Sequence, residues 1–339
     1  MRQAGNLKYA LGILILLAVG ACGDSSTAQG AGAGPNDAPN PYRLDPGWAK
    51  TALGRNFGST IGIAADPDGM SIWVYDRCGG FSCTESRIAP LQKFDADGNL
   101  VAAIGEGLTN YPHGLAVDDD GNVWITDATE EQDNGQGHTV RKLSPTGEVL
   151  MTLGTPGVAG DGENTFNRPS SVAIGLNGEI YVGDGHGGDS NSRVVMFNAD
   201  GSFVKTWGEL GSEPGEFDQP HAMAVDSTGR LFVGDRVNNR IQIFDAEGNF
   251  LEEWRQFGRP SGLYIDDNDM IYVADSQSDE TLNPGFEQGV RIGSVTDGIV
   301  TEFIHGPDLQ GSPEGVAADS AGNVYVGYTG GTAFKRFVK

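Results

Sequence analysis

Short apolar runs, each closed by a polar turn, recur along the chain from residue 60 to the C-terminus. In the second repeat, the apolar residues 115–117 lead to an Asp/Gly-rich turn and then to residues 123–125, which end near Asp127. β-Branched and aromatic runs of about five residues between Asp, Asn or Gly turns are typical of β-hairpins. Because no stretch keeps an apolar period of 3.6 residues, the pattern predicts almost no helix.

Most repeats contain a second hairpin, so one repeat unit supplies four strands. Its turn is visible at residues 95–98 in the first unit and at residues 144–147 in the second. The six units follow one another at intervals of about 40 to 57 residues, which indicates propeller blades. The sequence therefore predicts an all-β fold, a six-bladed β-propeller formed by residues 46–339.

The last repeat unit reaches the C-terminus after only three strands, so one blade lacks a strand. Residues 48–54 resemble the fourth strand of the second unit, which lies at residues 151–154. We expect this N-terminal strand to complete the sixth blade, because closing the ring removes two open sheet edges at once.

The segment before the repeats has a different composition. Residues 9–19 form an apolar run that follows two basic residues, is too short to span a bilayer as a helix, and is typical of a signal peptide. Small residues precede Cys22, a pattern similar to the bacterial lipoprotein cleavage box, in which the cysteine carries lipid. An ordinary signal peptide with an incidental cysteine is the alternative. We expect residues 1–22 to be a lipoprotein-type signal peptide that ends in the lipidation cysteine, and residues 23–45 to be a flexible tether.

The formal net charge of −24 comes from 46 acidic and 22 basic residues. Phosphate contacts need clustered Lys and Arg, so no nucleic-acid partner is expected. The protein is predicted to be an exported monomer, lipid-anchored in the bacterial cell envelope on the periplasmic or outer face, which touches the membrane through the anchor alone.

Many of the acidic residues lie in turns. In five of the six repeat units an Asp ends the second strand, and we interpret it as a structural residue. These residues are Asp76, Asp127, Asp184, Asp235 and Asp275. Tyr328 stands at that position in the sixth unit.

Two cysteines remain if Cys22 is lipidated. Cys78 and Cys83 lie five residues apart in an exported protein, and we expect them to close a small disulfide loop. A metal-binding pair is the alternative, but no histidine or third cysteine stands beside them.

At one position of the repeat, the type of side chain alternates from unit to unit. The second residue of each unit's first strand is Ile, His, Ser, His, Ser and Glu in turn, at Ile61, His113, Ser170, His221, Ser261 and Glu314. In a closed ring of six blades, units two, four and six lie about 120° apart. His113, His221 and Glu314 are therefore predicted to meet on the axis. Two imidazoles and a carboxylate bind zinc or another divalent metal, and three protein ligands leave one position open.

Two Pro-His pairs, at residues 112–113 and 220–221, and the run Asp-Arg-x-x-x-Arg-Ile-Gln at residues 235–242 resemble a known group. The chain resembles six-bladed NHL-type propellers, specifically the peptidyl-α-hydroxyglycine α-amidating lyase catalytic domain and its bacterial relatives, from about residue 62 onward. This resemblance implies a lyase that cleaves a carbinolamide into glyoxylate and a peptide amide. The family uses a zinc held by three histidines, a calcium deeper in the channel, two arginines and a tyrosine.

The resemblance assigns roles to individual positions. His113 and His221 match the first two zinc ligands, and Glu314 stands where the family has its third histidine. Arg77 and Arg236 match the two arginines, each directly after the Asp that ends a second strand.

Two other family positions differ in this chain. His186 follows an Asp-Gly pair where the family has its tyrosine, and we expect it to take over proton transfer, since an imidazole titrates near neutral pH. The calcium carbonyls map to Ile63 and Leu115, but Gly315 replaces the calcium-binding Asp, which makes calcium doubtful. His138 and His305 lie in loops and are interpreted as surface residues.

Three functional hypotheses remain open at this point. The first is a metal-dependent C–N lyase that takes a small-molecule or peptide substrate in the axial channel. The second is a metal-dependent lactone or ester hydrolase. The third is a non-enzymatic NHL propeller that binds a peptide, a glycan or an envelope protein.

Overall fold

The structure is a computed structural model that describes Met1 and residues 34–51, 55–128, 135–309, 311–330 and 334–339. These described residues contain no helix, as the sequence predicts, and hence no helix long and apolar enough to cross a membrane. The predicted signal peptide, Cys22 and the first part of the predicted tether lie outside the described residues.

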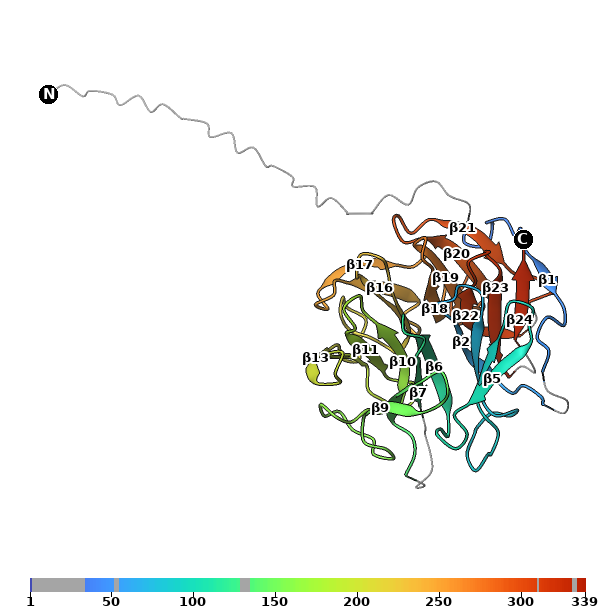
Figure 1. The fold of residues 1–339 in the computed structure, drawn as a ribbon. Helices are drawn as coiled ribbons and strands as arrows, with labels where there is room; N and C mark the ends of the chain where they lie inside the picture. Colours follow the sequence, from blue (N-terminus) through green and yellow to red (C-terminus); the bar gives the residue numbers. More distant parts are fainter. Residues whose placement is uncertain (2–33, 52–54, 129–134, 310, 331–333) are drawn as a thin grey trace. The chain divides into compact units, whose positions relative to one another are not determined.

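Six antiparallel four-stranded sheets form the blades of a propeller (Figure 1). The first three blades contain β2 (Thr60–Ala65), β3 (Ile72–Asp76), β4 (Leu91–Phe94), β5 (Leu100–Ile104), β6 (Pro112–Val117), β7 (Val123–Asp127), β8 (Thr139–Leu143), β9 (Val149–Leu153), β10 (Pro169–Ile174), β11 (Ile180–Asp184), β12 (Arg193–Phe197) and β13 (Phe203–Trp207). The last three contain β14 (Pro220–Val225), β15 (Leu231–Asp235), β16 (Arg240–Phe244), β17 (Phe250–Trp254), β18 (Pro260–Ile265), β19 (Met270–Asp275), β20 (Gly289–Ser294), β21 (Val300–Ile304), β22 (Ser312–Ala318), β23 (Val324–Thr329), β24 (Lys335–Val338) and β1 (Arg43–Asp45). The first strand of each blade touches the first strand of the next, and β22 returns to β2, so the predicted six-bladed ring is confirmed.

The ring is closed by an N-terminal strand, as predicted, but the strand lies earlier than residues 48–54. β1 pairs with the outer edge of β24, with Leu44 opposite Phe337. Of the residues first assigned to this strand, 48–51 contain only an isolated bridge at Lys50, and 52–54 lie outside the described part of the chain.

Trp48 explains why the closing strand is displaced. Its indole ring is buried and packs against Phe94, Tyr325 and Phe334, at centroid distances of 6.1, 4.9 and 6.1 Å. These rings belong to the first and last blades, so Trp48 fills the seam between them. A buried aromatic ring contributes more here than a solvent-facing strand position would, and the chain before it takes the free edge of β24.

The chain before β1 also packs on the ring, which corrects the predicted boundary at residue 46. Fully buried Arg291 donates from Nη2 to Asn36 Oδ1 at 2.9 Å and from Nε to the Pro35 carbonyl at 3.1 Å. Ala38 and Tyr42 are buried as well. The propeller therefore begins near Pro35, and residues 35–45 are part of the fold rather than tether.

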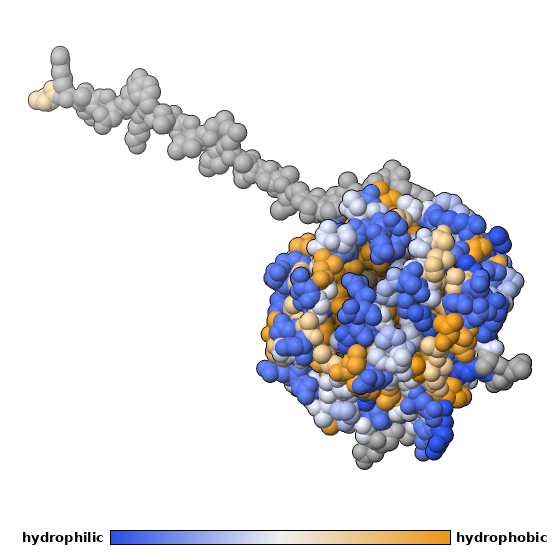
Figure 2. Space-filling model, viewed as in Figure 1, coloured by the Kyte–Doolittle hydropathy of each residue, from blue (hydrophilic) through white to orange (hydrophobic). Residues whose placement is uncertain are grey.

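The hydrophobic core lies between neighbouring blades. Trp73 and Tyr75 of β3, for example, pack against Val123 and Ile125 of β7, and all four side chains are almost fully buried. Truncating one large aromatic side chain in such a layer costs about 3–5 kcal/mol. Each blade is thus held by its neighbours. On the visible outer face, apolar residues are interspersed among hydrophilic ones (Figure 2).

The Asp that ends the second strand in the first five blades is structural, as predicted. Asp235 is fully buried and accepts hydrogen bonds from the Asp218 amide at 2.7 Å and from Arg240 Nε at 2.8 Å. It therefore ties the loop before the blade to the third strand of the same blade. In the sixth blade, buried Tyr328 occupies this position, and Lys335 Nζ lies 5.1 Å from its ring centroid.

Candidate metal centre

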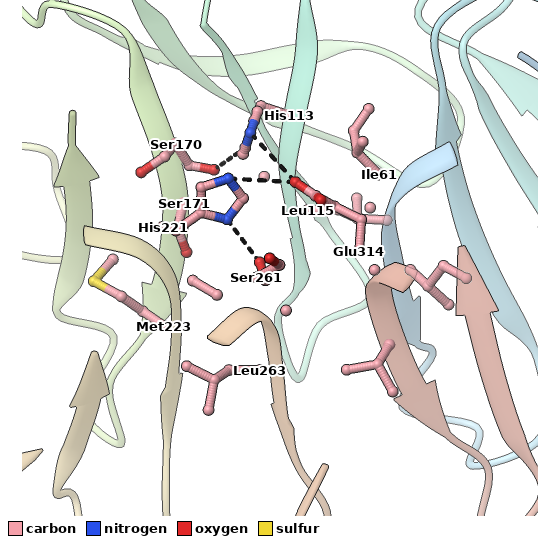
Figure 3. Close-up of a pocket in the computed structure, with 17 residues that line it drawn as sticks. Ile61, His113, Leu115, Ser170, Ser171, His221, Met223, Ser261, Leu263 and Glu314 are labelled. Carbon is pink, nitrogen blue, oxygen red and sulfur yellow. Dashed lines mark hydrogen bonds and ion pairs between the residues drawn. The ribbon is translucent and has the colours of Figure 1, made fainter. Parts of the chain in front are cut away.

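A break in strand register turns one side chain of each inner strand out of its sheet. In β14, Pro220 lies opposite Asp235 and Ala222 opposite Gly234, so His221 has no partner in β15. The same position is skipped in the other inner strands, at Ile61, His113, Ser170, Ser261 and Glu314. Bulges of this kind redirect side chains next to functional sites. The chemically alternating position is therefore the bulged position, and its side chains gather at the axial pocket (Figure 3).

Glycine follows the bulge where neighbouring inner strands approach closely. A Cβ atom on Gly262 would lie 1.9 Å from the Glu314 carbonyl oxygen, and one on Gly315 would lie 2.7 Å from the Ile61 carbonyl oxygen. Neither distance is compatible with an unshifted backbone. The backbone of Glu314 is therefore seated directly against β18, which fixes where its side chain starts.

The predicted trio comes together in the structure. Glu314 Oε1 lies 3.3 Å from His221 Nε2 and 4.0 Å from His113 Nε2. Ligand atoms lie about 2.0–2.2 Å from zinc, so two donors to one ion can be at most about 4.4 Å apart. Both distances meet this condition, and the donor set fits a divalent metal.

A backbone carbonyl orients each histidine. His113 Nδ1 donates to the Ser170 carbonyl at 2.6 Å, and His221 Nδ1 donates to the Ser261 carbonyl at 2.7 Å (Figure 3). Since a carbonyl oxygen only accepts, Nδ1 carries the proton and Nε2 presents its lone pair to the pocket. Both Nε2 atoms are buried and lack a hydrogen-bond partner among the described residues. Metal-binding histidines are typically oriented by such an outer hydrogen bond.

A third imidazole reaches the same place from a loop. His186 lies between β11 and β12, and its ring centroid is 4.3 Å from that of His113 and 5.2 Å from that of His221. One nitrogen from each of the three rings falls within a set whose members are all within 4.8 Å of one another. The sequence assigned His186 to proton transfer and did not place it among the metal donors.

Burial keeps these imidazoles uncharged. Desolvation, followed by the positive charge of Arg77, lowers the pKa of His113 to about 3. Desolvation is also the main reason that the pKa values of His221 and His186 lie well below the usual 6.5. The neutral imidazole is the form that binds metal. The role of His186 in proton transfer stays a prediction.

Glu314 carries the only carboxylate among the residues that line the pocket. Burial raises its pKa, and the charges of Arg236 and Arg77 act in the opposite direction. A divalent cation beside this carboxylate would stabilise its ionised form by the same mechanism.

The two predicted arginines flank this pocket in buried positions. Arg77 follows β3, and its Nε donates to the Pro112 carbonyl at 3.2 Å. Arg236 follows β15 and donates from Nη2 to Gln219, while its Nε has no hydrogen-bond partner among the described residues. Desolvation lowers the pKa of both guanidinium groups, and the negative charge of Glu314 opposes that shift in each. Both cations are thus close enough to the carboxylate to interact with it.

Tyr111 is a site residue that the sequence reasoning missed. The Cζ atom of Arg77 lies 3.7 Å from its ring centroid, and the His186 ring centroid lies 6.2 Å from it. Tyr111 directly precedes the Pro-His pair of the second blade. Comparing the residue before each inner strand across the six repeats would have singled out this aromatic side chain.

The predicted disulfide between Cys78 and Cys83 is confirmed, and the alternative of a metal-binding pair is excluded. The bridge closes the first turn of the β3–β4 connection, directly after Arg77. The Cys83 amide donates to the Asn110 carbonyl at 2.7 Å, which ties this loop to the residue before Tyr111.

The inner strands line the axial pocket, a cavity of about 50 Å³ beside His113 and His221. Ile63 and Leu115 line it, as the calcium prediction requires, but Gly315 offers no side-chain oxygen. The donor set at that depth therefore lacks the carboxylate that calcium prefers.

The remaining two histidines are less exposed than predicted. His138 is half-buried, and its Nδ1 accepts a hydrogen bond from the Arg168 amide at 3.2 Å. The ring of half-buried His305 stacks on Phe303, with centroids 4.7 Å apart. Both have local packing roles.

Comparison with known proteins places these features in a family context. The NHL repeat pattern matches residues 109–131 and 217–244, which include both Pro-His pairs. NHL repeat-containing protein 3 of Mus musculus is 33% identical over 200 residues, which covers 58% of this chain and 54% of that protein. Peptidyl-alpha-hydroxyglycine alpha-amidating lyase 2 of Drosophila melanogaster is 29% identical over 202 residues, 53% of this chain and 46% of the lyase. The chain spans about half the length of these relatives.

Solved structures support the fold. A gluconolactonase from Xanthomonas campestris superposes with a TM-score of 0.58 at 17% identity, covering 91% of this chain and 98% of the other. At that identity the likeness concerns architecture alone. Taken together, the chain carries NHL repeats in a six-bladed propeller and is homologous to NHL repeat proteins and to peptidyl-α-hydroxyglycine amidating lyases.

Proposed function

We propose that this homologue of the amidating lyases is a metal-dependent propeller enzyme that breaks the C–N bond of an α-hydroxyamide-type substrate. The observation that carries the proposal is the convergence of His113, His221 and Glu314 from three alternate blades on one buried position. Buried polar atoms are normally hydrogen-bonded, and a propeller that binds partners through its outer loops needs no unpartnered imidazole nitrogens on its axis. The reaction class comes from the lyase relatives.

The trio is suited to zinc or to another divalent ion that accepts imidazole and carboxylate ligands. Such an ion supplies a Lewis acid that acidifies a substrate hydroxyl and offsets developing negative charge. Glu314 brings a negative charge where a third imidazole would be neutral, so this centre is a weaker Lewis acid than one with three histidines. Calcium is not part of the proposal.

The reaction transfers one proton from oxygen to nitrogen and breaks the C–N bond. The substrate hydroxyl loses its proton, and the electron pair of that O–H bond forms the carbonyl of an aldehyde. The C–N bond breaks with its pair going to nitrogen, which takes up a proton and leaves as a primary amide. For an α-hydroxyglycine substrate the second product is glyoxylate, and no oxidant or reductant is consumed.

Arg77 and Arg236 bind the substrate carboxylate or amide carbonyl. Charge-assisted hydrogen bonds from guanidinium groups are strong and directional, and both side chains are almost fully buried. Arg236 Nε has no partner among the described residues and is available as a donor. These contacts hold the substrate so that its hydroxyl faces the imidazole nitrogens.

Tyr111 is assigned to the proton transfer in place of His186. Its ring lies beside both Arg77 and His186, between the substrate-binding cation and the imidazoles. A phenol can both give and accept a proton, which matches a step that takes a proton from oxygen and returns one to nitrogen.

The test uses residues 23–339, purified without chelator, as wild type, Glu314→Ala and the control His305→Ala. Bound metal is measured by plasma emission, and glyoxylate release is measured with an N-acyl-α-hydroxyglycine. We expect about one divalent ion per chain and glyoxylate release from wild type and control, with both lost in Glu314→Ala. Retention of metal and activity by Glu314→Ala would remove Glu314 from the centre.

Other outcomes separate the competing functions. Bound metal without glyoxylate release, together with turnover of a lactone or ester, would replace the lyase by a hydrolase. Absence of both metal and turnover would favour a binding propeller for a peptide, a glycan or an envelope protein.

The proposal includes lipid anchoring at Cys22 in a bacterial envelope. Full-length chain expressed in a bacterial host should incorporate labelled fatty acid and sediment with membranes, whereas Cys22→Ser should do neither. Equal labelling of the two chains would refute the anchor and leave an ordinary signal peptide.

A further inference from the structure

We propose that His186 is itself a ligand of the metal ion, so that the centre contains three imidazoles and one carboxylate. This inference rests on the proposed metal centre and changes its composition. The third imidazole comes from the β11–β12 loop of the third blade, whereas the other three donors come from the inner strands of blades two, four and six.

Ring geometry places His186 among the donors. Its centroid is nearer to His113 than the His221 centroid is, 4.3 Å against 4.7 Å. Ligand atoms from the three rings form a set with no separation above 4.8 Å. Two donors at about 2.1 Å from one ion stand at most about 4.2 Å apart. The widest pair would therefore have to contract by at least about half an ångström for both nitrogens to bind the same ion.

An unpartnered buried atom gives the second indication. His186 Nδ1 is buried and has no hydrogen-bond partner among the described residues, a condition it shares with the Nε2 atoms of His113 and His221. Burying a polar atom without a partner is unfavourable. Three such nitrogens at one place are readily explained by a cation that all of them bind.

The loop that carries His186 is fixed at several points. Arg168 donates from Nη1 to the Gly187 carbonyl at 2.8 Å, directly after the histidine. Asn191 Nδ2 donates to Asp184 Oδ2 at 2.7 Å and to the Gly160 carbonyl at 2.8 Å. These bonds tie the loop to the end of β11 and to neighbouring loops, which limits the movement of the backbone that carries His186.

Glycine makes this loop shape accessible. Gly187 and Gly188 have φ values of 69° and 54°, in the left-handed region that side chains other than glycine rarely adopt. They begin a turn in which the Ser190 amide donates to the Gly187 carbonyl at 3.3 Å, directly after His186.

Four protein donors change what the ion can do. A tetrahedral ion with four protein ligands has no open position, whereas catalysis requires one. The centre would then favour an ion that accepts five or six ligands. Iron, nickel and copper accept imidazole, and manganese accepts carboxylate. The type of metal ion that the protein prefers therefore indicates how many protein ligands the ion has.

The test measures the ligand set directly on residues 23–339. Cobalt(II) is added to metal-free wild type, His186→Ala, His221→Ala and the control His305→Ala, and dissociation constants are obtained by competition with a chelator. X-ray absorption at the cobalt edge counts the imidazoles, and circular dichroism checks that each variant keeps its β fold.

The proposal predicts three imidazoles in wild type, two in His186→Ala, and cobalt binding at least about 100-fold weaker in that variant, because a direct ligand is lost. Two imidazoles in wild type, with unchanged affinity in His186→Ala and lost affinity in His221→Ala, would overturn the role of His186 and leave the proposed function intact. Wild-type affinity as weak as that of His221→Ala would overturn both.

Discussion

Replacing Gly262 by alanine tests whether backbone packing positions the proposed metal centre. The added Cβ would stand 1.9 Å from the Glu314 carbonyl oxygen, where ordinary contact begins at 3.4 Å, so β18 and β22 must separate locally by about 1.5 Å. Overpacking of this kind costs about 1–3 kcal/mol. The Glu314 side chain moves with its backbone, and a misplacement of about 1 Å can cost about 100-fold in rate.

The assay compares Gly262→Ala with Gly80→Ala, whose added Cβ would meet nothing closer than the Arg77 carbonyl oxygen at 3.9 Å. We expect Gly262→Ala to melt a few degrees lower, to bind metal about 10- to 100-fold more weakly, and to lose most of its turnover, while Gly80→Ala behaves as wild type. Wild-type metal affinity in a folded Gly262→Ala would refute the reasoning, since Glu314 would then be placed independently of β18.

Three further predictions concern individual side chains. Arg77→Lys should raise KM for a carboxylate substrate about 10-fold by loss of a directional guanidinium contact, with metal content unchanged; an unchanged KM would remove Arg77 from substrate binding. Tyr111→Phe should lower kcat about 100-fold or more at constant metal content, and full kcat would return the proton transfer to another group. Because the folded-state pKa of His113 is depressed from 6.5 to about 3, the folded chain resists protonation, and stability falls as pH drops below 6.5. In metal-free protein, the free energy of unfolding of His113→Gln should therefore rise by about 2 kcal/mol relative to that of wild type as the pH falls from 7 to 5. If the free energies of unfolding of the two chains change in parallel with pH, the shift is contradicted.

The blades and the inner-strand trio could be predicted because each depends on local repetition. A four-strand unit with Asp/Gly turns sets the register of its own first strand, so the residue after Pro112 and the residue after Pro220 must occupy equivalent places in the ring. Because His or Glu occupies this place in every second blade, the symmetry of the ring brings these side chains together on its axis. The shift in register that turns these side chains inward was not visible in the sequence, but it did not affect the conclusion.

The closing strand could not be placed by the same reasoning. Residues 48–54 match a fourth strand in pattern, but tertiary packing decides which segment pairs with β24. Trp48 stabilises the fold more when its ring packs between the first and last blades. Composition misled in the same way at Pro35 and Asn36, which read as tether but hold the buried Arg291. A segment outside the repeats cannot be aligned with an equivalent segment elsewhere in the chain, so its pairing cannot be inferred by comparison.

His186 and Tyr111 show why loop residues at the centre are hard to foresee. Both stand outside the inner strands, and their approach to His113 depends on how the connections fold. The sequence identified His186 as a candidate for proton transfer, but not its approach to His113 or the burial that lowers its pKa. Desolvation is a property of the assembled ring and is absent from any single repeat.

The most direct test of the metal centre is the metal content of residues 23–339 beside the double variant His113→Ala/His221→Ala. Both chains are purified without chelator and compared by plasma emission, with circular dichroism to confirm equal folding. The convergence of the two imidazoles with Glu314 predicts about one divalent ion per wild-type chain and none in the variant. No stoichiometric metal in the wild type, or equal metal in the two chains, would contradict a catalytic ion on the propeller axis.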